Sequence, residues 1–147
     1  MAQPDIIKGT YFSLMLGDGG GPETFTALCG FTTRTFRGQI NTADQFTRDC
    51  DDPENVPVRR ITATGKQWSL SGEGTVNRAN LEAIQNELGD ISNWRFAFTE
   101  PADDLVYQGY WAGAFMLTSI EITASDESYA TINISLESDG EVLFTEV

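Results

Sequence analysis

The chain has 147 residues, 40% of them hydrophobic, and its 9 Lys and Arg against 22 Asp and Glu give a net charge of −13. This length and composition indicate one domain with a buried core and exclude a disordered acidic chain. The absence of histidine excludes Ser-His-Asp and Cys-His catalysis and every zinc site that contains histidine.

Charge and apolar runs limit the partners further. No Lys or Arg follows Arg95, whereas ten Asp and Glu do, so this part of the chain cannot attract phosphates. No apolar run approaches the roughly 18 residues of a membrane helix, and the N-terminus lacks the pattern of a signal peptide. We therefore expect folding in the cytoplasm and no membrane partner. Cys29 and Cys50 are too few for a disulfide framework and are expected to be free thiols.

The N-terminal part reads as strands. "TYFSLML" places Phe12, Leu14 and Leu16 on one face, and "TFTALC" and "FTTRTF" flank Gly30 and are rich in β-branched and aromatic residues. The glycine-rich "GDGGGPE" lacks the GK[ST] of a phosphate loop, so we interpret it as a flexible hairpin connection.

A long charged stretch, "NTADQFTRDCDDPENVPVRR", follows at residues 41–60 without a helix or strand pattern. Connections in compact domains are mostly short, and one of this length is usually functional or disordered. Its carboxylates have neither the spacing nor the turn glycine of an EF-hand loop. We therefore predict one long charged loop here, with no metal ion.

The next elements are a strand, a helix and a strand. "KQWSLS" points Trp68 and Leu70 inward, and "WRFAFT" does the same with alternate aromatic residues. Between them, "NRANLEAIQNELG" predicts a helix at about 77–88, with Asn77 as the N-cap and Gly89 after its end. Its apolar stripe consists of Leu81, Ile84 and Leu88.

The C-terminal part is again strand-like. Residues 105–123 change the parity of their apolar face near Thr118, which predicts a bulge or bend. Gly109 and Gly113 within this run indicate close backbone approach. "YATINISLE" alternates strictly, and "EVLFTEV" predicts a last short strand.

These elements predict a mainly β protein: a β-sandwich or flattened barrel of roughly seven strands, with one flanking helix and a single domain over 1–147. Two other functions remain open from the residues alone. One is a monomeric carbohydrate-binding β-sandwich that uses Trp68, Trp94 and Trp111. The other is a glycosidase without histidine, although no carboxylate pair stands out among Glu73, Glu82 and Asp90.

The order of segments resembles the major tail tube protein of long-tailed bacteriophages and gene transfer agents. The resemblance rests on "ITATGKQWSLSGEGTV", on the helix after it, and on "YQGYWAGAFMLTSIEI" followed by "YATINISLESDG". It implies a structural subunit without catalysis or cofactor. Hexameric rings would stack into a hollow tube in the tail of the particle, and DNA would pass through the lumen to the recipient cell.

The resemblance also implies partners and contacts. The partners are further copies of the chain, other tail proteins at the tube ends, a length-determining protein, and double-stranded DNA that passes without specific binding. The loop at about 38–58 would protrude and contact the adjacent ring. The charged residues expected in that contact are Asp44, Arg48, Asp49, Asp51, Asp52, Glu54, Arg59 and Arg60.

An acidic lumen would repel DNA, whereas a cationic one would bind its phosphates. Five acids at turns or on polar strand faces are candidates for facing the lumen: Asp103, Asp104, Asp126, Glu127 and Glu137.

Overall fold

The computed structural model describes residues 3–4, 6–100 and 103–147. Its strands are β1 (Phe12–Gly17), β2 (Phe25–Ala27), β3 (Phe31–Thr47), β4 (Val58–Thr75), β5 (Ile91–Glu100), β6 (Asp103–Ser125), β7 (Ser128–Ser138) and β8 (Leu143–Glu146). A short 3-10 turn, η1 (Gly9–Tyr11), precedes β1, and the helix α1 spans Arg78–Asn86.

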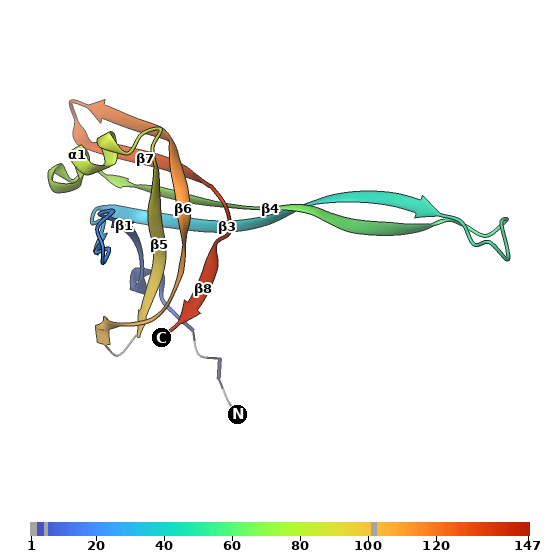
Figure 1. Ribbon diagram of the computed structural model, residues 1–147. Helices are drawn as coiled ribbons and strands as arrows, with labels where there is room; N and C mark the ends of the chain where they lie inside the picture. Colours follow the sequence, from blue (N-terminus) through green and yellow to red (C-terminus); the bar gives the residue numbers. More distant parts are fainter. Residues whose placement is uncertain (1–2, 5, 101–102) are drawn as a thin grey trace.

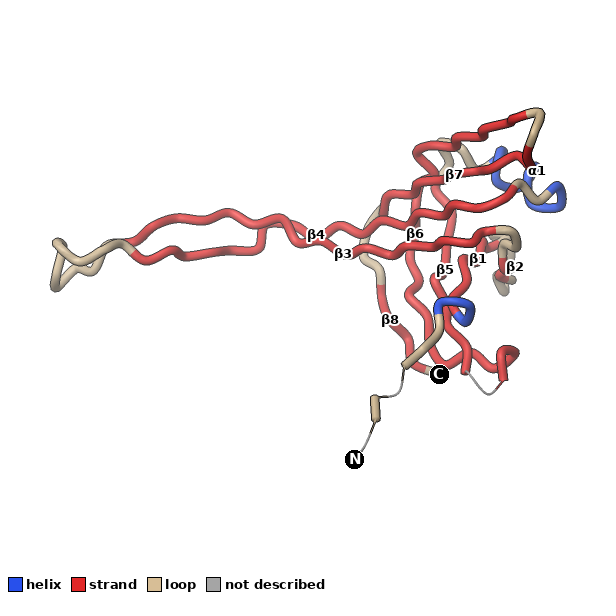
Figure 2. Tube along the Cα trace, turned by 180° about the vertical axis from the view of Figure 1, so that it is seen from behind, coloured by secondary structure: helices blue, strands red, loops and turns tan. Residues whose placement is uncertain are grey.

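The described strands form one antiparallel sheet in the order β2-β1-β5-β6-β7-β4-β3, with β8 also paired to β6. The long strand β6 joins two parts of this sheet, because its first half pairs with β5 and β8 and its residues 115–125 pair with β7. The sheet therefore folds over itself into two layers, and β3, β4 and β7 cross β1 and β5 (Figures 1 and 2). The mainly β, sandwich-like fold expected from the sequence is confirmed.

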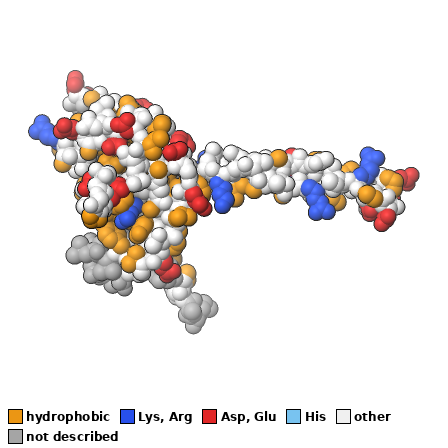
Figure 3. Space-filling view, viewed as in Figure 1, with side chains coloured by type: hydrophobic (Ala, Val, Ile, Leu, Met, Phe, Trp, Pro, Cys, Tyr) orange, Lys and Arg blue, Asp and Glu red, His pale blue; other side chains and the backbone are white. Residues whose placement is uncertain are grey.

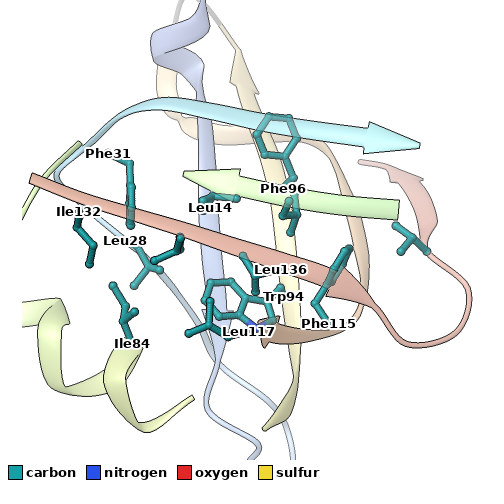
Figure 4. Close-up of a cluster of buried hydrophobic side chains, with 13 residues drawn as sticks. Leu14, Leu28, Phe31, Ile84, Trp94, Phe96, Phe115, Leu117, Ile132 and Leu136 are labelled. Carbon is teal, nitrogen blue, oxygen red and sulfur yellow. The ribbon is translucent and has the colours of Figure 1, made fainter. Parts of the chain in front are cut away.

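The core lies between these two layers (Figure 4). Aromatic rings connect them, since Phe36 of β3 stacks on Phe96 of β5 with 5.9 Å between ring centroids and lies 5.4 Å from the ring of Trp111 of β6. The alternation read from the sequence is confirmed in β7, and Trp94 and Phe96 of β5 are buried as expected, although Ala97 and Thr99 on the other face of β5 are buried too. The largest fully buried side chains come from both layers: Leu14, Leu70, Trp94, Phe115, Leu117, Ile134 and Leu136.

The irregularity predicted in β6 is confirmed. The register between β6 and β7 shifts between Leu117 and Ser119, and the Thr118 hydroxyl donates a hydrogen bond to the Ser135 carbonyl at 3.1 Å. The close backbone approach predicted at two glycines is present at Gly113, where a Cβ would lie 3.2 Å from the Glu141 carbonyl oxygen, whereas Gly109 is approached by side chains. A Cβ on Gly109 would lie 2.9 Å from Phe98 Cε1, and one on Gly113 would lie 2.8 Å from Val142 Cγ2.

The helix is shorter than the predicted range. The Asn77 side chain caps it by accepting a hydrogen bond from the Ala79 N–H at 3.1 Å, and Ile84 is buried in the core. Leu88 lies past the last turn and is 45% exposed, so the prediction that it packs in the apolar stripe is wrong. The chain turns away there because Gly89, at φ +84°, donates its N–H to the Leu117 carbonyl of β6.

The glycine-rich connection between β1 and β2 is organised by one carboxylate. Asp18 Oδ1 accepts hydrogen bonds from the N–H groups of Gly20 at 2.8 Å and Thr24 at 3.0 Å. These bonds favour the ionised carboxylate and lower the pKa of Asp18 from its ordinary value. The segment is therefore a structured turn, which agrees with the interpretation of "GDGGGPE" as a hairpin connection.

Candidate assembly surfaces

Four strands, namely β3, β4, β7 and the second half of β6, form one layer whose outer face is polar. Successive side chains of a strand point to opposite faces, so the residues between the core positions of these strands face outward. We call this surface the polar wall. Its side chains are Thr33, Thr35, Arg37, Ser69, Ser71, Glu73, Thr75, Ser119, Glu121, Thr123, Thr131, Asn133, Ser135 and Glu137.

The register arranges this wall in rows across the strands. One row consists of hydroxyl side chains only: Thr35, Ser71, Ser135 and Ser119. The next row runs from Thr33 through Glu73 and Asn133 to Glu121. Because strands lie about 4.8 Å apart, the two glutamates of that row are about 10 Å apart. The wall is thus built from small hydroxyl groups with acids set among them.

Basic side chains are sparse on the polar wall. Arg37 is the basic residue among the wall positions, and the register places it in the same row as Ser69 and Glu137. Lys and Arg must cluster before they release enough counterions to hold a nucleic acid backbone. This surface therefore lacks the charge pattern of a DNA-binding site.

Within the described residues, neither edge of this four-stranded layer pairs with another strand. On one side, the body part of β3 pairs only with β4. On the other side, β6 leaves β5 at Met116, and residues 118–125 then pair only with β7. Exposed edges of this kind are templates for pairing with another chain.

The second feature is a hairpin that projects from the body, formed by residues 38–68 (Figures 1 and 2). We call it the arm. The sequence predicted a long loop here, and the protrusion is present, but its shaft is a paired ribbon that runs from Gly38 opposite Trp68 to Thr47 opposite Val58. Only its end, residues 48–57, is a turn without strand pairing. The prediction that the segment lacks a strand is wrong for the shaft.

The two faces of the arm differ. Ile40, Phe46 and Ile61 lie on the face that continues from the core side of β3 and β4, and they are 55%, 66% and 58% exposed. We call this the apolar face of the arm, and it also carries Thr42, Asp44, Arg59 and Lys66 between and beside the apolar side chains. The opposite face is mostly polar, apart from Ala43 and Val58, and consists of Gln39, Asn41, Gln45, Thr47, Arg60, Thr62 and Gln67. An isolated two-stranded ribbon with exposed apolar side chains is marginal in water, so this face is suited to cover by a partner.

The charged residues predicted for this segment are all exposed on the arm. Asp44 and Arg59 form an ion pair across the ribbon, with 3.0 Å between Asp44 Oδ2 and Arg59 Nε. The acids Asp49, Asp51, Asp52 and Glu54 lie with Arg48 at the tip, and Arg60 lies on the polar side of the shaft. Figure 3 shows the basic groups spaced along the arm and acidic groups at its tip.

The structure does not bring the five predicted lumen acids together. Asp103 opens β6, whereas Asp126 and Glu127 lie in the turn after the far end of the same strand. The side chains of Asp103 and Asp104 lie outside the described part of the chain. Glu137 belongs to the polar wall.

Sequence reasoning missed Glu73 and Glu121 as wall residues. Both alternate with core residues in their strands, and this alternation in the sequence indicates that they face away from the core. Their common face, however, depends on the pairing of β4, β7 and β6.

The tryptophans do not form an open platform for a sugar. Trp94 is fully buried, and Trp68 and Trp111 pack against the core.

Both cysteines are exposed free thiols, as expected. A membrane-spanning helix is not found in the described part of the chain.

The model of the phage tail tube protein family matches residues 6–144. The chain belongs to this family. It is therefore a structural tail tube subunit. A comparison with the curated proteins finds no match.

Solved structures share the fold of this tail tube protein. The virion of a native gene transfer agent contains a chain with a TM-score of 0.73 and 19% identity, over 95% of this chain and 99% of that one. A chain in the tail of an empty gene transfer agent particle with C6 symmetry has a TM-score of 0.73 and 20% identity, over 95% of this chain and 99% of that one. The tail tube of SPP1 contains a chain with a TM-score of 0.68 and 16% identity, over 97% of this chain and 80% of that one.

Proposed function

We propose that six copies of this tail tube protein close into a ring, that rings stack through the arms, and that double-stranded DNA passes along the polar walls to the recipient cell. The observation that carries this proposal is a four-stranded layer with two unpaired edges and a polar outer face. The subunit contributes no catalytic step and needs no cofactor.

Ring closure follows from the two edges. The edge of β3 on one copy and the edge of β6 on the next copy can pair, and the same contact repeated around an axis leaves no edge open. The number six is supported by the C6 symmetry of the gene transfer agent tail, whose subunit has this fold. The four strands of each copy then line a continuous inner barrel.

The polar wall faces the lumen in this arrangement, because the other layer and the helix lie on its opposite side (Figure 1). Hydroxyl side chains keep the wall hydrated, and Glu73, Glu121 and Glu137 repel phosphates. A duplex therefore moves without specific binding.

The arm reaches the adjacent ring. Stacking covers its exposed apolar face, and the charged tip and the Asp44–Arg59 pair set the register of the contact more than its affinity. Axial stacking of this kind does not fix a length, so we include a separate length-determining protein and other tail proteins at the tube ends as partners. The particle is a phage or a gene transfer agent, and the subunit folds and assembles in the bacterial cytoplasm.

Electron microscopy of the purified protein tests the proposal. We expect rings or tubes with a central channel from the wild-type chain. A strict monomer at high concentration would overturn the proposal.

A shortened arm tests the two contacts separately. Asn41 lies directly opposite Gly65, so residues 42–64 can be replaced by Asn-Gly, which closes a two-residue hairpin at that pair. We expect this variant to fold and to form rings, while stacked tubes fall at least tenfold in negative-stain counts. Tubes of wild-type length from this variant would contradict the role of the arm.

A further inference from the structure

A preformed groove lies on the core side of the unpaired edge of β3. Its volume is about 650 Å³. The groove residues used in the argument are Gly9, Thr10, Phe12, Arg34, Phe36 and Phe96. The floor is flat and apolar, because the Phe96 ring stacks on that of Phe12 at 5.2 Å and on that of Phe36 at 5.9 Å, as measured between ring centroids.

One arginine fixes the width of this groove. The Arg34 guanidinium donates to the Gly9 carbonyl at 2.9 Å through Nη2 and to the Phe31 carbonyl through Nη1. The bond to Gly9 ties η1 to β3 across the groove, and the bond to Phe31 holds the guanidinium within β3. The groove and the bond to Gly9 are therefore present in the isolated subunit.

A strand added to the edge of β3 would present side chains to two sides alternately. One set would join the polar wall, and the other set would point toward the groove. A matching strand therefore needs polar residues on one face and at least one exposed apolar residue on the other.

The opposite edge of the same layer has this pattern. In β6, Glu121 and Thr123 belong to the polar wall, and Ile122 between them points to the core side. Ile122 is 46% exposed, although its cross-strand neighbour Ile132 is 4% exposed. The subunit itself leaves Ile122 half uncovered at the edge that lacks a partner.

We propose that Ile122 of one copy enters the groove of the next copy, above the rings of Phe12, Phe36 and Phe96, when the two edges pair. This proposal rests on the proposed ring. It assigns the occupant of the groove as a second copy of the chain and gives the edge pairing a direction, because β3 supplies the groove and β6 supplies the side chain.

The substitution Ile122→Asp tests the contact, with Thr123→Asp as the matched control. Both place one carboxylate on the same edge, but only the first buries it in an apolar groove. Circular dichroism and melting temperature should show that both monomers fold as the wild type does. We expect rings and tubes to fall at least tenfold for Ile122→Asp and to remain within twofold for Thr123→Asp.

Cross-linking supplies a second measurement that does not depend on the aspartate variant folding. In a chain with Cys29→Ser and Cys50→Ser, Ile122→Cys and Thr10→Cys are combined, and assembled protein is treated with a short bis-maleimide. We expect a ladder of covalent oligomers on a denaturing gel from the double variant and none from either single variant. Thr123→Cys with Thr10→Cys serves as the control and should give no ladder.

The outcomes separate the contact from the ring. Wild-type rings together with full assembly of Ile122→Asp, or with no ladder, overturn the contact and leave the ring intact. Equal loss in both aspartate variants also overturns it, because edge pairing alone would then explain the result. A wild-type chain that stays monomeric overturns the ring and the contact together.

Discussion

At the scale of single residues, glycines mark where backbones meet. Gly74 of β4 lies under the turn that enters β3, and a Cβ there would lie 2.1 Å from the Gly30 carbonyl oxygen and 2.7 Å from Phe31 Cα. Both atoms belong to backbone, so a methyl group cannot be accommodated by rotating a side chain. The position thus helps to hold β3 against β4 at the end of the two strands that is remote from the arm.

The variant Gly74→Ala should destabilise the monomer by about 1–3 kcal/mol, the usual cost of overpacking a tight site. Urea unfolding followed by tryptophan fluorescence measures this change. Gly65→Ala is the matched control, since its Cβ would meet only Asn41 Nδ2 at 3.7 Å, and its effect should stay within about 0.5 kcal/mol. Equal stability of the two variants would show that the backbone around Gly74 relaxes freely.

At the scale of elements, the arm is a β-ribbon that carries its own contact face. Its apolar side chains continue the core face of the body outward, past the point where the second layer ends. A partner can cover this face without any change in the shaft. The exposure of Phe46 means that its replacement removes little packing from the isolated subunit.

Phe46→Asp should therefore leave the melting temperature of the monomer within about 2 °C of the wild type, in line with the small effects of surface substitutions. Stacked tubes should fall at least tenfold in electron micrographs, because an aspartate would be buried in an apolar contact. Gln45→Asp carries the same charge on the polar face and should leave tube formation unchanged. Loss of tubes in both variants would assign the effect to charge instead of to the apolar face.

The elements could be predicted where burial leaves a period in the sequence. Alternation in β5 and β7, the N-cap at Asn77 and the parity change near Thr118 all record which side chains face the core. The shaft of the arm was missed because both of its faces are exposed. Its hydrogen bonds are as regular as those of the body, but they impose no hydrophobic period.

The polar wall could be predicted only in part for a related reason. The outward position of Glu137 follows from the alternation within β7. Which residues of the neighbouring strands lie beside it depends on the register of the sheet. Glu73 and Glu121 join one surface only through Asn133, which pairs with both. A single sequence does not state that three strands share a sheet in that order. The turn acids Asp126 and Glu127 are exposed but lie beyond the end of the wall strands.

At the scale of the whole molecule, charge differs between the surfaces assigned to the lumen and to the contacts. The polar wall carries three acids and one arginine, whereas the arm carries four basic side chains along its length and five acids, four of them at its tip. The proposed tube therefore exposes its weakly acidic hydroxyl wall to DNA and places the basic groups of the arm at the contact between rings. This arrangement depends on the negative charge of the polar wall.

Reversal of the wall charge tests the whole arrangement. The triple variant Glu73→Lys, Glu121→Lys and Glu137→Lys should assemble into tubes of wild-type length, because these side chains are exposed on the polar wall and point away from the core side, on which the groove lies. Purified tubes should then retain duplex DNA at low salt and release it steeply as salt rises, since each lysine releases counterions on binding phosphate. Particles that carry the variant should deliver DNA at least tenfold less efficiently.

The control for this prediction has the same net charge in another place. Glu82→Lys, Asp90→Lys and Glu146→Lys change three exposed acids on α1, on the turn after it and on β8, all outside the polar wall. If the wall faces the lumen, this control should deliver DNA as the wild type does, although both variants gain equal positive charge. A defect of equal size in the control would show that total charge governs delivery, and undiminished delivery by the wall variant would show that DNA does not meet this face.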